Sequence, residues 1–220
     1  MLSARTPQLG LNLIEVMISL AVLSILIGLG APGFVEWLQN QQTRAAAEAT
    51  LNGLQVARGE AVRRNTPVRF ALVSDLTSTC VLSADSLTLP VSVSWVVSQG
   101  DPTSKCDTKA DPADPANPRI VQSRTSAEGS PNAVATSVFI PSPPAAPNPQ
   151  AASTVTFAAL GNVIANADGT PSINKIDLTN NKLGPNASRP LRLVINAGGS
   201  IRMCDPSLAV SDTRGCPAFP

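Results

Sequence analysis

The chain has 220 residues, which is enough for one globular domain with an additional segment. Charged residues make up only 14% of it and the formal net charge is +1, so it carries no strong field that would gather nucleic acid or anionic lipid without sequence preference. The absence of histidine excludes a Ser-His-Asp or Cys-His catalytic site and removes the commonest metal ligand, and a 3% aromatic content leaves few surfaces for stacking bases.

An apolar run follows a short polar segment at the start of the chain. Residues 1–10 carry one charge, Arg5, and residues 11–31 read LNLIEVMISLAVLSILIGLGA. About 20 apolar residues in a helix span the core of a bilayer. The run is too long for an ordinary secretory signal peptide, and no A-x-A cleavage site follows it. A plain signal anchor would explain the length but not Glu15, because a carboxylate in such a segment costs about 3 kcal/mol.

Gly10, Leu11 and Glu15 form a pattern at the start of this run. With it the segment resembles the type IV prepilin family, whose leader ends in Gly and whose mature chain begins with an N-methylated hydrophobic residue and carries Glu at the fifth position. The resemblance implies that prepilin peptidase cuts after Gly10 and that Leu11 becomes the methylated N-terminus. It also implies that Glu15 pairs with the terminal amine of a neighbouring subunit. The family's commonest pattern has Phe first and Thr second, whereas this chain has Leu11 and Asn12.

Glycines and a proline cluster at the end of the apolar run. Pro32 removes one helical hydrogen bond and crowds the preceding turn, and Gly28, Gly30 and Gly33 lower helix stability. We predict a kink in the helix at Pro32, a position where pilins often carry a kinking proline.

The helical pattern continues beyond this cluster. Residues 36–65 contain no proline, and apolar residues recur at steps of four, three, three and four, which is helical spacing: Ala47, Leu51, Leu54, Ala57 and Ala61. We expect this stripe to dock on a sheet and the helix to end at Asn65, just before Pro67.

The end of this helix carries a second pattern. Residues 57–68 read ARGEAVRRNTPV, and nine of these twelve residues match the string AR-x-EA-x-RRN-x-PV. The segment thereby resembles the GspH/FimT group of minor pilins and pseudopilins. A simpler interpretation is a solvated basic helix end in which Arg63 and Arg64 complement the helix dipole, and both interpretations can hold.

Beyond Pro67 the periodicity changes to that of strands. The runs are short and rich in Val, Ile, Thr and Phe, and we expect strands at 68–73, 91–97, 120–124, 134–140, 154–157, 162–164, 175–178, 191–195 and 200–204. Residues 110–118 and 141–150 are rich in Pro and Ala and should form loops. Phe157 and Gly161 resemble the F-x-x-x-G-x-V hairpin of the GspH/FimT group, so Phe157 is expected in the core.

These elements predict an α+β fold, in which a long N-terminal helix packs on antiparallel β-sheets as in pilins. The expected parts are a leader peptide at 1–10, a transmembrane and polymerisation helix at 11–33, an amphipathic helix at 34–66 and a β-rich periplasmic domain at 67–220.

Four cysteines, none in a Cys-x-x-Cys pair, favour disulfides over zinc in an exported domain. Because short loops close most readily, we prefer the neighbour pairs Cys80–Cys106 and Cys204–Cys216. Three pairings are open, as are four free thiols.

Basic residues gather near the C-terminus. The DNA-capturing FimT-type minor pilins carry a G-R-x-R element where this chain reads Gly199-Ser200-Ile201-Arg202, so the first Arg is replaced. A DNA-binding patch is one interpretation and ordinary surface arginines are the other, for these residues: Arg189, Arg192, Arg202 and Arg214.

The expected function is structural. The resemblances imply a minor pilin or pseudopilin of a type IV pilus or a type II secretion system, at or near the filament tip. Such a subunit crosses the inner membrane once, exposes its globular domain to the periplasm and assembles with other pilins. No motif indicates an enzyme, a cofactor or a metal site. The alternative is a FimT-like DNA receptor for natural transformation.

Overall fold

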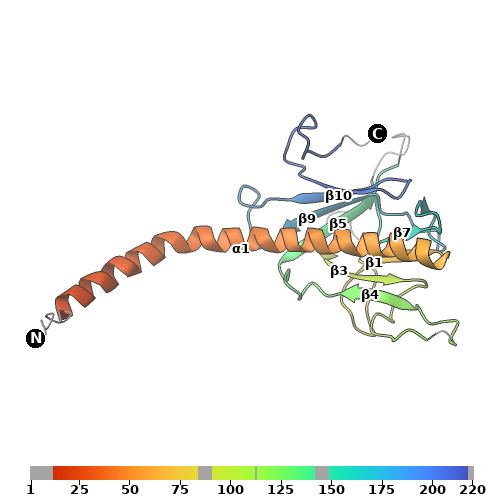
Figure 1. The fold of residues 1–220 in the computed structure, drawn as a ribbon, viewed down its shortest axis with the longest axis horizontal. Coiled ribbons are helices and arrows are strands. Elements are labelled where there is room, and N and C mark those ends of the chain that lie inside the picture. The colour runs from red at the N-terminus through yellow and green to blue at the C-terminus, as the bar shows by residue number, and fades with distance from the viewer. Residues whose placement is uncertain (1–11, 84–90, 112, 142–148, 218–220) are drawn as a thin grey trace, which may run out of the picture. The chain divides into compact units, whose positions relative to one another are not determined.

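The computed structural model describes residues 12–83, 91–111, 113–141 and 149–217. The chain divides into two compact units, Met1–Leu38 and Gln39–Pro220. One helix and eleven strands occupy the described part, in the order α1 (Leu13–Arg64), β1 (Val68–Val73), β2 (Val91–Ser92), β3 (Ser94–Ser98), β4 (Ile120–Arg124), β5 (Ala133–Phe139), β6 (Gln150–Ala151), β7 (Thr154–Phe157), β8 (Val163–Ile164), β9 (Lys175–Asn180), β10 (Leu191–Ile195) and β11 (Ile201–Cys204) (Figure 1).

The end of α1 is fixed by an asparagine in a left-handed conformation. Asn65 has φ 52°, and its N–H donates to the carbonyl of Val62 at 3.4 Å. The N–H of Thr66 donates to the carbonyl of Ala61 at 3.3 Å. These two bonds form a Schellman motif, and Pro67 prevents the helix from continuing. The predicted helix end at Asn65 is therefore confirmed.

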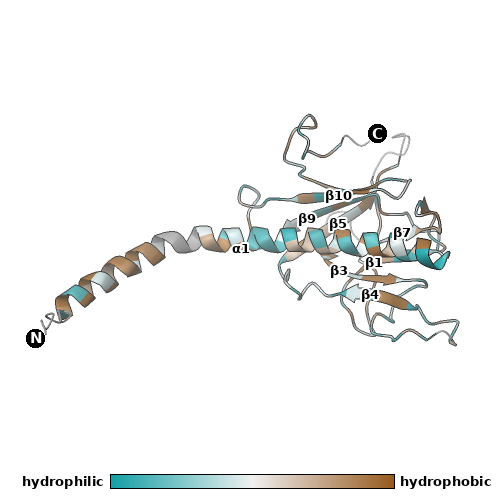
Figure 2. Ribbon diagram, in the orientation of Figure 1, coloured by the Kyte–Doolittle hydropathy of each residue, from teal (hydrophilic) through white to brown (hydrophobic). Residues whose placement is uncertain are grey.

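Within the second unit, α1 packs its small side chains on two sheets. Ala47, Leu54, Ala57 and Ala61 of the predicted stripe are fully buried, and Leu51 is partly buried against the same core. The opposite side of this half of the helix is hydrophilic (Figure 2). Alanine at most of the contact positions allows the helix backbone to lie close to the sheets, and apart from Leu54 the largest fully buried side chains come from the β-rich part of the chain.

The strands form two antiparallel sheets. The first has the order β4-β3-β1-β7-β8 and the second the order β11-β10-β9-β5-β2, with β6 paired to β5. The common core includes Phe70 and Trp95 from the first sheet and Ile176, Leu178 and Leu193 from the second. The predicted α+β class with antiparallel sheets is confirmed.

Two expectations about the strands are wrong. The predicted strand 91–97 is two strands, because Val91 and Ser92 pair with β5 while Ser94 and its successors pair with β1 in the other sheet. The chain crosses between the sheets at Val93, whose side chain is buried. Gln150, expected in a loop, lies in β6 because it pairs with Phe139.

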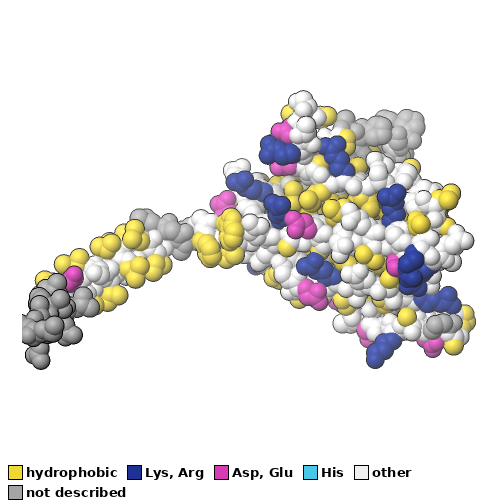
Figure 3. Space-filling model, viewed as in Figure 1, with side chains coloured by type: hydrophobic (Ala, Val, Ile, Leu, Met, Phe, Trp, Pro, Cys, Tyr) yellow, Lys and Arg dark blue, Asp and Glu magenta, His cyan; other side chains and the backbone are white. Residues whose placement is uncertain are grey.

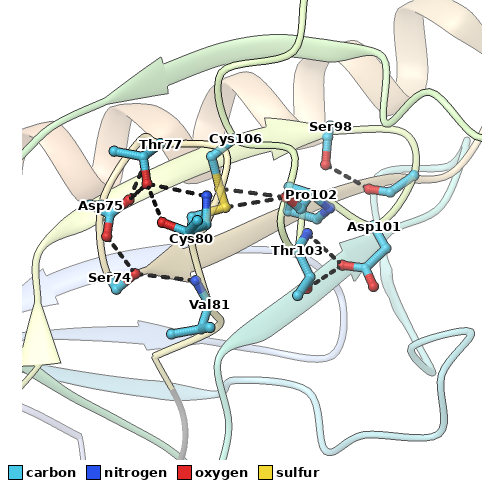
Figure 4. The surroundings of a disulfide bond; sticks show 12 residues. Ser74, Asp75, Thr77, Cys80, Val81, Ser98, Asp101, Pro102, Thr103 and Cys106 are labelled. Atoms are coloured by element: carbon cyan, nitrogen blue, oxygen red, sulfur yellow. Dashed lines mark hydrogen bonds between the residues drawn. A yellow bond between two sulfur atoms is a disulfide. The ribbon is translucent and has the colours of Figure 1, made fainter.

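A second, smaller core covers the other face of the first sheet. Cys80 is bonded to Cys106, the neighbour pairing favoured by loop closure, and both sulfurs lie close to the Pro102 carbonyl oxygen (Figure 4). This disulfide packs on Ala71, Val73 and Val96. Both faces of β1 are therefore buried, which explains its nearly continuous apolar sequence.

The second disulfide joins Cys204 to Cys216 and closes a loop of 12-residue separation after β11. It packs on Val194 of β10. Closing a loop of this size restricts the unfolded chain and stabilises a domain by about 3 kcal/mol.

Arg69 is a buried charge in β1, with only 8% of its side chain exposed. Its Nη2 lies 2.7 Å from Oδ2 of Asp168, and its Nη1 lies 3.5 Å from Oδ1 of Asp101. Burial raises the pKa of Asp168, but hydrogen bonds from Thr170 and Arg69 outweigh this, and the pKa falls from 3.8 to about 2.

This lowered pKa gives a pH-dependent stability. Asp168 stabilises the folded state fully above pH 3.8, and this contribution is lost as the pH falls through about 2. We expect Asp168→Asn to lower the unfolding midpoint at pH 7 and to lose less stability than the native chain between pH 4 and pH 2, as measured by circular dichroism. Glu128→Gln, which changes a carboxylate that is 65% exposed, should follow the native pH profile. Parallel profiles for all three proteins would contradict the role of Asp168.

Candidate functional site

The described part of the first unit is a mostly apolar helix, and nearly all of its described side chains are exposed. Leu13 and Met17 are 77% and 63% exposed, and Ile25 is also 63% exposed. Most residues in the described part of these turns are coloured as hydrophobic, with hydrophilic residues in the first turn (Figure 2). Among the described residues no single helix qualifies alone as a membrane span, whereas Leu13–Gly28 and Gly33–Arg64 qualify together as a bent pair by length and composition.

Glu15 is the acidic residue in the first turn of α1. It is exposed, and its carboxylate has no hydrogen bond or ion pair within the described part of the chain. Its position near the positive end of the helix dipole favours a negative charge. The neighbouring side chains of Ile14, Val16 and Ile18 are apolar and exposed, so none of these three can pair with the carboxylate.

The hydroxyl groups of this segment, in contrast, are satisfied within the helix. Ser19 donates to the carbonyl of Glu15 and Ser24 to the carbonyl of Leu20, each at 2.7 Å. Such bonds to the preceding turn allow serine to lie in apolar surroundings at small cost. Among the polar side chains between Leu13 and Gly28, Glu15 thus differs from Ser19 and Ser24, because its carboxylate forms no hydrogen bond within the described part of the helix.

Gly10 and Leu11 lie outside the described residues. Pro32 lies within α1. The kink at Pro32 stays a prediction.

The C-terminal arginines share part of one sheet face but are mostly engaged. Arg192 of β10 pairs with Cys204, and Val194 pairs with Arg202 of β11, so both arginines lie on the same face of the second sheet. Arg192 forms a two-pronged ion pair with Asp177, its Nη2 lying 3.1 Å from Oδ2.

The remaining arginines have different environments. Nη2 of Arg202 donates to the carbonyls of Thr213 and Gly215, at 2.8 Å and 3.2 Å, and so holds the disulfide loop. Arg214 pairs with Asp212 at 3.3 Å. Only the side chain of Arg189 makes no hydrogen bond or ion pair with the residues that the structure describes.

Glu60 organises the basic end of α1. Its Oε2 lies 2.6 Å from Nη2 of Arg63 and 2.6 Å from Nε of Arg64. The hydrogen bond from Arg63, followed by that from Arg64, lowers the pKa of Glu60 to about 2. An acidic residue three and four positions before two arginines can pair with both on one helix face, as Glu60 does here.

A junction of three segments was not foreseen from the sequence. Nε of Arg58 donates to the carbonyl of Gly161 at 3.1 Å, across 103 positions of the chain. Gly199 packs against that same carbonyl group, and the N–H of Val163 donates to the carbonyl of Ala197 at 2.9 Å. The junction ties α1 to one turn from each sheet. The patterns singled out Arg58 and Gly161, but nothing in them predicts their contact.

The described residues contain no group of three or more His, Cys, Asp or Glu side chains placed to hold a metal ion. The four cysteines are all in disulfides.

Two crystal structures of the type IV minor pilin FimU from Pseudomonas aeruginosa, in space groups P65 and P21, are similar to this chain at 15% identity, with TM-scores of 0.38 and 0.40. The alignments cover 75% and 78% of this chain and 94% and 95% of FimU. No curated protein matches. The family model for the type II transport protein GspH matches residues 46–199, from the buried face of α1 to the Gly199 junction, and this chain is therefore a member of the GspH family, as its resemblance to the GspH/FimT minor pilins and pseudopilins indicated.

Proposed function

We propose that this chain is a non-enzymatic, membrane-anchored minor pilin or pseudopilin that enters a filament through its N-terminal helix. Residues 1–10 form the leader, prepilin peptidase cuts between Gly10 and Leu11, residues 11–33 cross the inner membrane once, residues 34–66 continue as the amphipathic helix, and residues 67–220 form the periplasmic domain. The observation that carries the proposal is the carboxylate of Glu15, which has no partner among the described residues and lies on an exposed apolar helix.

A carboxylate in lipid costs several kcal/mol unless an opposite charge lies beside it. Cleavage before Leu11 would create an amine close in sequence to Glu15, and the amine of a neighbouring subunit could neutralise this carboxylate. A subunit would then seat stably only in the register that pairs the two charges.

Glu15→Ala tests this pairing. We expect the full-length variant to be processed and to form both disulfides, while its recovery in sheared filaments falls about tenfold or more, because the neighbour's amine is left buried and unpaired. Immunoblotting of filament and membrane fractions measures the effect. Glu36→Ala, a carboxylate in the same unit but beyond the apolar run, is the matched control and should assemble normally. Equal recovery of both variants would contradict the pairing.

Processing has its own readout. Mass spectrometry of the cellular protein should find a methylated chain that begins at Leu11. A chain that begins at Met1, or one cut after Ala31, would contradict the prepilin interpretation.

The chain is proposed to lie at the filament tip of either a type IV pilus or a type II secretion pseudopilus. The identity of its neighbours in the filament tests this position. Chemical cross-linking of intact filaments followed by purification of the chain identifies those partners. Recovery with other minor subunits supports the tip, and recovery mainly with the most abundant subunit would contradict it.

DNA capture is the alternative function. Residues 175–214 carry six basic residues against three acidic ones, a net charge of +3. The internal contacts of Arg192, Arg202 and Arg214 reduce their availability. A duplex DNA shift that weakens steeply with salt and is lost in Arg189→Ala would favour this alternative, and no shift at low salt would exclude it.

A further inference from the structure

The turn between β7 and β8 displays an apolar side chain in solvent. Leu160 is 90% exposed, more than any other large hydrophobic residue of the second unit in the described part of the chain. Val62 on α1 is 53% exposed, and a Cβ placed on Gly161 would lie 3.3 Å from its Cγ2, so turn and helix meet here. We call Leu160 and Val62 together the Leu160 knob.

Hydrogen bonds within the turn and from α1 hold the turn that carries Leu160, and no residue in the described part of the chain covers that side chain. Within the turn, the N–H of Ala158 donates to Asn162 and the N–H of Gly161 to Ala158, both at 2.8 Å. From outside, Arg58 binds the Gly161 carbonyl and Gly199 packs on the same group. An apolar side chain on a preorganised turn loses little conformational entropy when a partner covers it.

The end of α1 that carries Val62 of the knob is basic. The last turns of α1 carry Arg58, Arg63 and Arg64 against Glu60, three basic residues minus one acidic residue, a local charge of +2. The side chain of Arg63 is 65% exposed. Dark blue side chains gather at this end of α1 in the space-filling view (Figure 3). A partner surface that fits would combine an apolar pocket with a carboxylate rim.

We propose that the Leu160 knob is a docking surface for a different subunit of the same filament, which receives Leu160 in an apolar pocket rimmed by Asp or Glu. The inference rests on the proposed function, because it needs the chain to stand in a filament. It adds a contact between globular domains to the contact made through the N-terminal helix, and it gives the basic helix end a role in partner choice.

Photo-cross-linking in intact filaments tests the contact. The full-length chain carries a benzophenone amino acid at position 160 or, as control, at Val210, which is 66% exposed and lies in the Cys204–Cys216 loop. We expect position 160 to cross-link to one other subunit and position 210 not to do so. A product with the mass of two copies of this chain, or equal labelling from both positions, would overturn the proposal.

Two substitutions measure how much the surface contributes. Leu160→Ser should lower recovery in sheared filaments about tenfold, as expected for the loss of a central anchor. Arg63→Glu should also lower it, whereas Arg44→Glu, a reversal at a similarly exposed arginine of α1, should not. Disulfide formation on non-reducing gels reports folding. Normal recovery of Leu160→Ser would overturn only the knob, whereas absence of the native chain from filaments would overturn the proposed function itself.

Discussion

Gly199→Ala is expected to destabilise the globular unit by about 4 kcal/mol, a loss in the upper range for single substitutions. A Cβ at this position would lie 1.8 Å from the carbonyl oxygen of Gly161, which is backbone and cannot move aside alone. Gly199 also has φ +78°, a conformation that alanine adopts at a cost. Any relaxation would pull Gly161 away from Arg58 and open the junction between the two sheets.

The neighbouring glycine provides the control. A Cβ on Gly198 would meet nothing within 4 Å, so Gly198→Ala should change stability by less than about 0.5 kcal/mol. Thermal unfolding of the full-length chains in detergent, followed by circular dichroism, compares the two variants. Equal melting temperatures for both would show that the junction does not hold the sheets together.

The local elements of the second unit were largely predictable from sequence. Strands 68–73, 120–124, 154–157 and 191–195 have the bounds that their Val, Ile, Thr and Phe content indicated. Pro67 precedes the first of these runs, and Pro190 and Asn196 flank the last, so turn-forming residues mark some of their ends. The helix end was predictable for the same reason, since Pro67 limits the conformation of its predecessor.

Long-range pairing was not predictable in this way. The run Val91–Val97 has uniform strand composition, yet it divides between two sheets, because the choice of partner depends on β1 and β5 rather than on the run itself. The same holds for the arginines near the C-terminus. The sequence left a DNA-binding patch and ordinary surface arginines as alternatives, and it did not predict that Asp177 pairs with Arg192 or that carbonyls of the disulfide loop bind Arg202.

The candidate assembly site shows the reverse situation. Its residues were identified from an unusual chemical pattern, a single carboxylate in an apolar run, and the structure adds that Glu15 has no partner within the described part of the chain. A charged residue within an apolar run is visible in the sequence because its polar group cannot be satisfied by its apolar neighbours. A junction that is satisfied internally, such as Arg58 with Gly161, is not visible in this way.

Gly53→Ala should destabilise the second unit by about 2 kcal/mol, although alanine is the better helix former. Gly53 lies on the buried face of α1, where a Cβ would come within 2.9 Å of Cε2 of Phe70 and 3.0 Å of two ring atoms of Trp95. Both rings are buried in the core and in contact with each other, with centroids 5.8 Å apart, so neither has room to withdraw. The glycine therefore sets how closely the helix approaches the first sheet.

Gly59→Ala on the same helix isolates this packing effect from helix propensity. A Cβ there would meet nothing within 4 Å, so the substitution should stabilise the unit by up to about 1 kcal/mol. Chemical denaturation of the two full-length variants should thus give shifts of opposite sign. If Gly53→Ala also raised the midpoint, the ring contacts would not limit the helix position, and the small-residue face of α1 would reflect propensity alone.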